Sequence, residues 1–249
     1  NSLFVGLKGE HFNGNKYAKE ALLRGCKYAI IDEEKYAEDD RFLHVDNALE
    51  TLQNLAHYHR SQMNLKVIGI TGSNGKTTTK ELIHHVLSKK FSTLATKKNF
   101  NNHIGLPLTL LELTQEHEFA IIEMGANHLY EIKQLCEIAD PDFGLITNIG
   151  KAHLEGFGSY ENIIKAKSEL YDHVCAKNGI IFYNATNELL LKLTQNRNCQ
   201  AYSYGNASTA YCPGIVTETS PFLEVTTENT PIKTQITGKY NFENIMAGI

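Results

Sequence analysis

The sequence predicts an α/β protein with a small N-terminal domain and a larger nucleotide-binding domain built on a parallel sheet. Two observations carry this prediction. Short apolar runs of strand length alternate with helix-length segments along most of the 249 residues, which is typical of parallel sheets covered by helices. One of these runs also leads directly into a glycine-rich turn and an amphipathic helix, over residues 66–87.

Residues 1–63 are expected to form the smaller α/β domain. Strand-length apolar runs and one helix-like segment follow each other here: 3–7, 28–31 and 42–45 for the strands, and 16–24 for the helix. Asn47 is placed to cap a further helix that runs to about Gln62, because leucines recur on one face of that segment. A unit of this size is marginally stable alone, so we expect it to rest on its neighbour.

Residues 64–249 are expected to form the P-loop-type ATPase domain. Continuous apolar runs predict the buried strands of its parallel sheet: 66–70, 119–122, 143–146 and 179–182. From residue 215 to 236 the pattern changes to alternating Thr, Val and Glu, with Pro221 and Pro231. This segment predicts a short antiparallel β excursion.

Composition excludes several classes of function. The formal net charge is −4, from 24 basic and 28 acidic residues, which argues against a nucleic-acid surface. No apolar stretch is long enough for a membrane helix, and no charged segment followed by an apolar run has the pattern expected of a signal peptide. The five cysteines are widely spaced and odd in number, so we expect reduced thiols in a cytoplasmic protein, which we also expect to be monomeric.

The strongest local signal is the glycine-rich turn at residues 69–79. Glycines between a strand and a helix let backbone N–H groups face an anion, Lys76 can reach the outer phosphates, and Thr77 is placed to bind Mg²⁺. Ile70 stands where the first glycine of the usual pattern belongs, and Gly72 is present instead. An ordinary turn with a solvated lysine is the alternative, but the flanking strand and helix favour phosphate binding. The predicted ATP contacts are Gly72, Ser73, Asn74, Gly75, Lys76, Thr77 and Thr78.

Three further polar residues are candidates for the site, two after predicted strands and one on a predicted helix. Glu123 ends a buried run, at the sheet edge where ligands of α/β proteins bind, and is placed to hold Mg²⁺. His153 follows another strand at the same edge, where a metal ligand and an ordinary polar residue are both possible. Taken by itself, Lys167 has the features of a surface lysine on a helix.

Taken together, these segments resemble the Mur ligase superfamily. Five motifs occur in the same order and with the same spacing: Thr71–Thr78, Glu123–Asn127, Thr147–His153, Ala166–Leu170 and Gly238–Asn244. The resemblance implies an ATP-dependent ligase of peptidoglycan synthesis that forms an amide through an acyl phosphate. It also implies two Mg²⁺ ions, and it implies that Asn241 and Asn244 face the adenine.

The resemblance gives Lys167 a different role. In this family the matching lysine is carbamylated by CO₂, and the resulting anion helps to hold the second Mg²⁺. Thr77, Glu123 and His153 would be the other metal residues, while Lys76, Lys167 and His153 would be the catalytic ones.

Within the superfamily, three segments resemble the ligases that add D-Ala-D-Ala to UDP-N-acetylmuramoyl-tripeptide: 4–14, 100–110 and 123–128. The first matches the start of a uridine-nucleotide-binding domain, and the second matches a substrate loop, which assigns Asn101 and Asn102 to substrate binding. Leu129-Tyr130 and Lys239-Tyr240 depart from the family pattern. A C-terminal ligase domain that closes over ATP is expected but absent from this chain, so we expect the chain alone to be inactive.

Two alternatives remain at the level of the sequence. One is another ligase of the superfamily, which adds a different amino acid or adds glutamates to folate. The other is a P-loop nucleotide-binding module without ligase activity. His153 and Lys167 argue against the second alternative, since a simple switch protein has no use for a second metal site.

Overall fold

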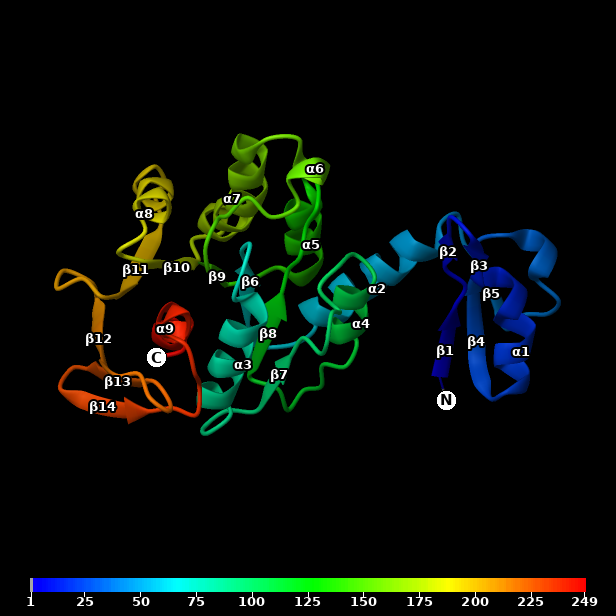
Figure 1. The fold of residues 1–249 in the computed structure, drawn as a ribbon. Coiled ribbons are helices and arrows are strands. Elements are labelled where there is room, and N and C mark those ends of the chain that lie inside the picture. Colours follow the sequence, from blue (N-terminus) through cyan, green and yellow to red (C-terminus); the bar gives the residue numbers. More distant parts are fainter. Residues whose placement is uncertain (1) are drawn as a thin grey trace. The chain divides into compact units, whose positions relative to one another are not determined.

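The computed structural model describes residues 2–249, which fold into two compact units that divide between Tyr58 and His59. Each unit has its own sheet (Figure 1). The α/β class and the two-sheet organisation predicted from the sequence are confirmed.

The first unit is a parallel three-stranded sheet with a helix packed against it. Its strands run in the order β1-β4-β5, with bounds β1 (Ser2–Val5), β4 (Cys26–Ile31) and β5 (Phe42–His44). The smaller elements are β2 (Lys8–Gly9), β3 (Phe12–Asn13), η1 (Gly14–Tyr17), α1 (Ala18–Leu23) and η2 (Glu34–Tyr36). Leu22 of α1 packs with Ala29, Ile31 and Phe42 of the sheet, and this apolar cluster is the core of the unit.

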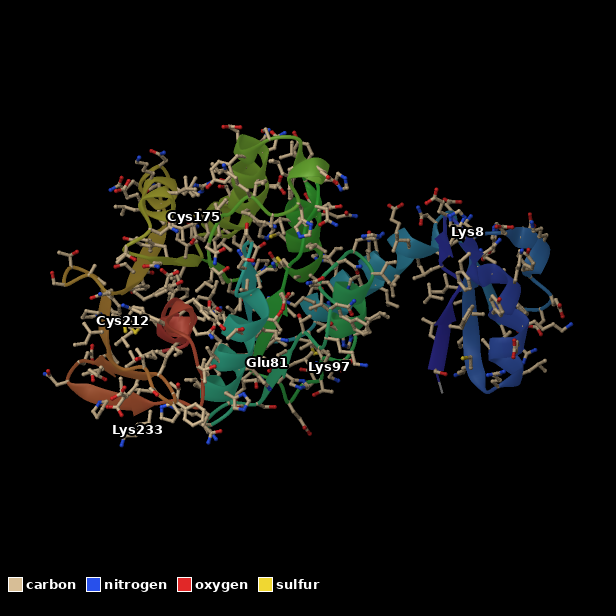
Figure 2. The ribbon with its side chains drawn as sticks, viewed as in Figure 1. Lys8, Glu81, Lys97, Cys175, Cys212 and Lys233 are labelled. Carbon is tan, nitrogen blue, oxygen red and sulfur yellow. A yellow bond between two sulfur atoms is a disulfide. The ribbon has the colours of Figure 1, made fainter. Side chains whose placement is uncertain are left out.

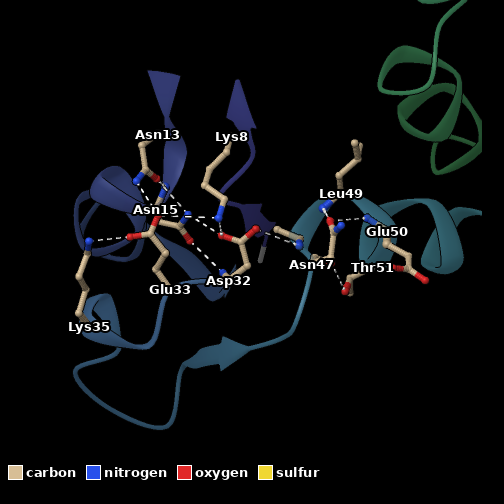
Figure 3. Close-up of polar contacts among 11 residues, drawn as sticks. Lys8, Asn13, Asn15, Asp32, Glu33, Lys35, Asn47, Leu49, Glu50 and Thr51 are labelled. Carbon is tan, nitrogen blue, oxygen red and sulfur yellow. Dashed lines mark hydrogen bonds and ion pairs between the residues drawn. The ribbon is translucent and has the colours of Figure 1, made fainter. Parts of the chain in front are cut away.

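A buried polar network stabilises the end of this sheet (Figure 3). Asn15 is 1% exposed, and its Nδ2 donates to Asp32 Oδ1 at 2.8 Å while its Oδ1 accepts from Asp32 N at 2.9 Å. Lys8 pairs with Asp32 at 3.1 Å. Burial acts to raise the pKa of Asp32, but the hydrogen bonds from Asn15 and Lys8 outweigh it and leave that pKa below its usual value.

Helix α2 (Ala48–Ser61) follows the first sheet. The predicted cap is confirmed, because Asn47 Oδ1 accepts from the backbone N–H groups of Leu49 and Glu50 at 3.0 and 3.1 Å. Near the end of α2, the buried Arg60 donates to the backbone oxygens of Ala139 and Asp140, both at 3.2 Å.

The second unit is built on a nine-stranded sheet in the order β14-β13-β12-β11-β10-β9-β6-β8-β7. Its strands are β6 (Lys66–Thr71), β7 (Thr93–Ala95), β8 (Phe119–Glu123), β9 (Phe143–Ile146), β10 (Ile180–Asn184), β11 (Gln200–Gly205), β12 (Cys212–Glu218), β13 (Glu224–Thr227) and β14 (Thr230–Lys233). The strands from β7 to β12 are parallel, and β12, β13 and β14 pair antiparallel as predicted.

Helices cover both faces of this sheet (Figure 1). They are α3 (Lys76–Leu87), α4 (Gly105–Leu110), α5 (Glu131–Ala139), α6 (Leu154–Phe157), α7 (Tyr160–Ala176), α8 (Glu188–Gln195), η3 (Lys239–Asn241) and α9 (Phe242–Met246). On one face, Ile83 of α3 and Ile245 of α9 join Ile70 in the core. On the other face α7 approaches so closely that a Cβ on Gly69 would lie 2.9 Å from Leu170 Cδ1.

The prediction of reduced thiols is wrong for two of the five cysteines. Cys175 at the end of α7 (Figure 2) is joined to Cys199, which precedes β11. The chain between them runs through β10 and α8 and returns, which brings the two Cα atoms within 5.1 Å. Wide spacing in the sequence therefore gave no sign of the pairing. Over residues 2–249, no helix has the length and apolar character needed to cross a membrane.

Candidate active site

Three loops meet at one edge of the large sheet. β6 lies between β8 and β9 with parallel register to both, so the carboxyl ends of these three strands are adjacent. The chain turns to one side of β6 for β7 and β8 and to the other for β9, and ligands of open α/β sheets bind at such a reversal. The expectation that the glycine-rich turn, Glu123 and the loop carrying His153 lie at the same edge of the sheet is confirmed.

The glycine-rich turn is braced by the loop that follows β9. Thr147 Oγ1 donates to Asn74 O at 2.6 Å, and Asn74 N donates to Asn148 Oδ1 at 3.0 Å. Gly72 has a φ of +147°, and a Cβ there would lie 2.0 Å from Thr147 Oγ1. Glycine is therefore required at position 72, although it stands apart from the usual pattern.

Lys76 lies at the first turn of α3 and folds back over the loop. Its Nζ donates to Gly72 O at 2.7 Å and to Ser73 O at 3.3 Å. Burial lowers the pKa of Lys76, while the negative charge of Glu123 opposes that shift. The first N–H groups of α3 have no acceptor within the helix. Together with the Lys76 ammonium, they make this end of the helix electrically positive.

Glu123 is a buried carboxylate at the end of β8. It is 2% exposed and accepts from Thr77 Oγ1 and from Asn101 Nδ2, both at 2.9 Å. In the described chain no lysine, arginine or histidine lies within ion-pair distance of it. This buried carboxylate is thus held by two neutral donors rather than by an ion pair, and its oxygens are the kind of ligand that Mg²⁺ prefers.

Lys167 is buried, contrary to its reading as a surface lysine, because α7 packs against the sheet and α5. Its Nζ lies 5.6 Å from the ring centre of Phe157, and among residues 2–249 it has no carboxylate within ion-pair distance. Burial, with a further contribution from the positive charge of Lys76, lowers the pKa of Lys167 to about 8. A substantial fraction of this amine is therefore neutral near pH 8.

A cavity of about 360 Å³ gathers all five of the predicted catalytic and substrate residues. Lys76, Asn101, Asn102, His153 and Lys167 all line it. His153 is exposed at the start of α6 with a φ of +57°, and its imidazole makes no hydrogen bond within the described chain. The part of the chain that the structure describes contains no group of three His, Cys, Asp or Glu residues with metal-binding spacing. A metal here would therefore also need ligands of other types.

The two asparagines of the predicted substrate loop have different roles in the fold. Asn101 donates to Glu123, whereas Asn102 Oδ1 accepts from the N–H groups of Ile104 and Gly105 at the start of α4. The cavity also contains residues that sequence reasoning did not single out: His103, Asn127, Glu131 and Gln134. Of these, Asn127 belongs to the Glu123–Asn127 motif, which was the one available signal for this part of the wall.

A second cavity, of about 1060 Å³, lies on the other side of the glycine-rich turn. Its walls include Asn74, Gly75, Thr78, Asn241 and Asn244. Asn244 Oδ1 accepts from Thr79 Oγ1 at 3.1 Å, and Asn244 Nδ2 donates to Asn241 Oδ1 at 2.8 Å. The two cavities thus share the glycine-rich turn, with Ser73 and Lys76 on one side and Asn74 and Gly75 on the other.

Comparison with known proteins connects this geometry to a family. The model of the Mur ligase middle domain matches residues 70–249. UDP-N-acetylmuramoyl-tripeptide–D-alanyl-D-alanine ligase of Bacillus subtilis (strain 168) is 38% identical over 254 residues, which cover 99% of this chain and 54% of the relative. The ligase of the same name from Escherichia coli (strain K12) is 34% identical, with 98% and 55% covered. The chain spans about half the length of the curated relatives it matches.

Solved structures give the same result. A crystal structure of MurF from Acinetobacter baumannii superposes with a TM-score of 0.85 at 34% identity and covers 99% of this chain and 55% of that one. MurF ligase from Thermotoga maritima in complex with ADP superposes with a TM-score of 0.85 at 30% identity, with 99% and 58% covered.

Proposed function

The chain belongs to the Mur ligase family, and on this premise we propose that it functions in the ATP-dependent addition of D-Ala-D-Ala to UDP-N-acetylmuramoyl-tripeptide. The terminal carboxylate of the tripeptide attacks the γ-phosphate, which forms an acyl phosphate and ADP. The amine of D-Ala-D-Ala then attacks the acyl carbon and releases phosphate. The observation that supports this proposal best is the glycine-rich turn shared by two cavities. ATP can lie along the turn with its base on the Asn244 side and its γ-phosphate on the Lys167 side.

Lys76 is the residue that would counter the charge repulsion in this reaction. A carboxylate that approaches a triphosphate meets strong like-charge repulsion, and Lys76 lines the same cavity as His153 and Lys167. When phosphates bind, we expect its Nζ to exchange Gly72 O and Ser73 O for phosphate oxygens. Each hydrogen bond to a charged group is worth about 1.5–3 kcal/mol.

The polar residues around Glu123 fit a divalent cation. Glu123 is a buried carboxylate without an ion pair in the described chain, and Thr77 and the exposed His153 are further possible metal ligands at the same sheet edge. We propose that these residues hold the two Mg²⁺ ions of the reaction together with a modified Lys167. When bound, Mg²⁺ polarises phosphoryl oxygens and neutralises their charge.

Lys167 fits a lysine that reacts with CO₂. Carbamylation joins a neutral amine to CO₂ and releases a proton, and the lowered pKa of about 8 supplies that amine. The product is an anion, so it would replace the repulsion between Lys167 and Lys76 by attraction. A carbamate would also add oxygen ligands to a site in which the described chain supplies few acidic groups.

The two units of the chain are assigned different ligands. We propose that residues 1–63 bind the uridine nucleotide of the substrate and that residues 64–249 bind ATP. The ligases of this name are about twice as long as the chain, so we propose that a further C-terminal domain takes part in the reaction. Soluble nucleotide substrates imply a cytoplasmic setting.

An assay of phosphate release tests this function. The complete natural protein is given Mg²⁺, ATP and UDP-N-acetylmuramoyl-tripeptide, with D-Ala-D-Ala, L-Ala, D-Glu or a diamino acid, each amine also being offered with its own UDP precursor. Release that depends on D-Ala-D-Ala supports the proposal. Release with another pair moves the protein elsewhere in the family. ATP binding without release in any combination favours a nucleotide-binding module and contradicts a ligase.

A further inference from the structure

Lys80 is a buried cation that none of the steps above uses. It lies one helical turn after Lys76 on α3 and is 1% exposed. Its Nζ donates to the backbone oxygen of Thr96 at 2.5 Å and pairs with Glu81 at 2.8 Å; Glu81 is labelled in Figure 2. Removing an ammonium group from water is costly even when it is paired. An apolar residue would fill this position at lower cost, so the contacts of Lys80 indicate a specific role.

Thr96 connects Lys80 to the strand that carries Glu123. It follows β7, and its backbone N–H donates to Ile121 O on β8 at 3.0 Å. Its Oγ1 accepts from the backbone N–H of Glu123 at 3.0 Å. One residue therefore receives Lys80 on its carbonyl oxygen and holds the end of β8 with its hydroxyl group.

We propose that Lys80 is a positioning residue that holds the Glu123 carboxylate in place through Thr96. Helix α3 supplies Lys76 and Thr77, whereas β8 supplies Glu123, so the distance between these elements determines the geometry of the site. The hydrogen bond from Thr77 to Glu123 is one connection between them. The contact from Lys80 to Thr96 is a second connection, one turn farther along the helix.

The consequence for metal binding rests on the proposed function, because it takes Glu123 to be a Mg²⁺ ligand. Without Lys80, the carbonyl oxygen of Thr96 loses its donor. Thr96 is then held less firmly, and so is the hydrogen bond that its Oγ1 accepts from Glu123 N. The carboxylate then samples more positions, and Mg²⁺ tolerates departures from octahedral geometry poorly. Nucleotide binding without metal does not depend on Glu123 and should not change.

Arg60 provides a matched control. It is also a buried cation that donates to backbone oxygens, those of Ala139 and Asp140. These oxygens precede β9, so they lie at the amino end of the strand and away from the site. Arg60→Met therefore measures the general effect of losing a buried cation.

Amide hydrogen exchange in the ligand-free chain is the first test. Lys80→Met should accelerate exchange of the Glu123 N–H by about tenfold relative to that of Ile121 on the same strand, since its acceptor is no longer fixed. Arg60→Met should leave this ratio unchanged. An unchanged ratio in Lys80→Met overturns the proposal.

Calorimetry of ADP binding with and without Mg²⁺ is the second test. In Lys80→Met the gain in ADP affinity on adding Mg²⁺ should fall about tenfold or more, while affinity without Mg²⁺ and the gain in Arg60→Met stay unchanged. A full gain in Lys80→Met overturns a role in the metal site. If the unsubstituted chain itself shows no gain, the proposed function fails together with that role, and the exchange result alone decides whether Lys80 holds Glu123.

Discussion

The two sides of the glycine-rich turn satisfy their polar groups in opposite ways. On the side of the second cavity, neutral groups pair with one another, from Thr79 to Asn244, from Asn244 to Asn241, and from Asn241 to the carbonyl of Thr237. On the other side, Glu123 and Lys167 are buried charged groups that form no ion pair within the described chain. The side of the second cavity therefore satisfies these polar groups within the chain, whereas the side of the first cavity leaves two charged groups with which a bound ion or ligand could pair.

The largest effect is expected at Lys76, on the side of the first cavity. Lys76→Ala should reduce ADP formation by the complete protein by about a hundredfold or more, because a preorganised charge at the reacting phosphate is lost. Its melting temperature should stay close to that of the unsubstituted protein. Lys192→Ala, on an exposed position of α8, is the control and should keep full activity. Near-normal ADP formation by Lys76→Ala would rule out its assigned role.

The second effect concerns the uncompensated cation. Lys167→Ala should be inactive and should regain part of its activity with short-chain carboxylates, which would occupy the space of a carbamate. The unsubstituted enzyme should lose activity in CO₂-depleted buffer and recover it when bicarbonate is added. Full activity without CO₂ would argue against carbamylation.

A stability measurement separates the destabilisation caused by the buried Lys167 ammonium from the role of Lys167 in the reaction. The pKa of Lys167 is lowered from 10.5 to about 8, so below pH 8 the ammonium is buried in the folded chain and its cost is fully present. Between pH 8 and 10.5 Lys167 is mostly neutral in the folded chain but still protonated in the unfolded chain. The destabilisation by the buried charge therefore decreases over this range. Lys167→Met should therefore stabilise the ligand-free chain by about 1–3 kcal/mol at pH 7, and by much less at pH 10. Urea denaturation at both pH values measures this, and a destabilised variant at pH 7 would contradict an uncompensated charge.

The smallest effect on the reaction is expected on the side of the second cavity, at Asn244. Asn244→Ala leaves Thr79 and Asn241 without their partner and should lower the free energy of unfolding by about 1–3 kcal/mol. The gain in ADP affinity on adding Mg²⁺ should stay as it is, since no charged group is changed. Calorimetry and urea denaturation check the two halves of this prediction. Loss of the Mg²⁺ gain would mean that the two sides are not separate.

The predictable part of the fold was the part determined by local patterns. The continuous apolar runs identified β6, β8, β9 and β10, and Asn47 was recognised as a helix cap from its position alone. β7 and β11 were missed. β7 is only three residues long, and β11 reads Gln-Ala-Tyr-Ser-Tyr-Gly without an apolar run. Both strands are specified by pairing with neighbours rather than by their own composition.

The site shows the same limit. Gly72, Lys76 and Glu123 were found because strand ends and glycines mark them in the sequence. Lys80 was not singled out and Lys167 alone was read as a surface lysine, because only tertiary packing shows that both helix positions are buried. Local signals thus identified the groups that we propose to contact a ligand, while the groups that position them depend on the tertiary structure.

A crystal structure with ADP and Mn²⁺ in place of Mg²⁺ tests the difference between the two sides most directly. The account predicts anomalous density for Mn²⁺ in direct contact with the Glu123 carboxylate, the base of ADP in the cavity lined by Asn241 and Asn244, and Lys76 Nζ moved from Gly72 O to a phosphate. A metal bound away from Glu123, or a base in the cavity lined by Lys167, would contradict it.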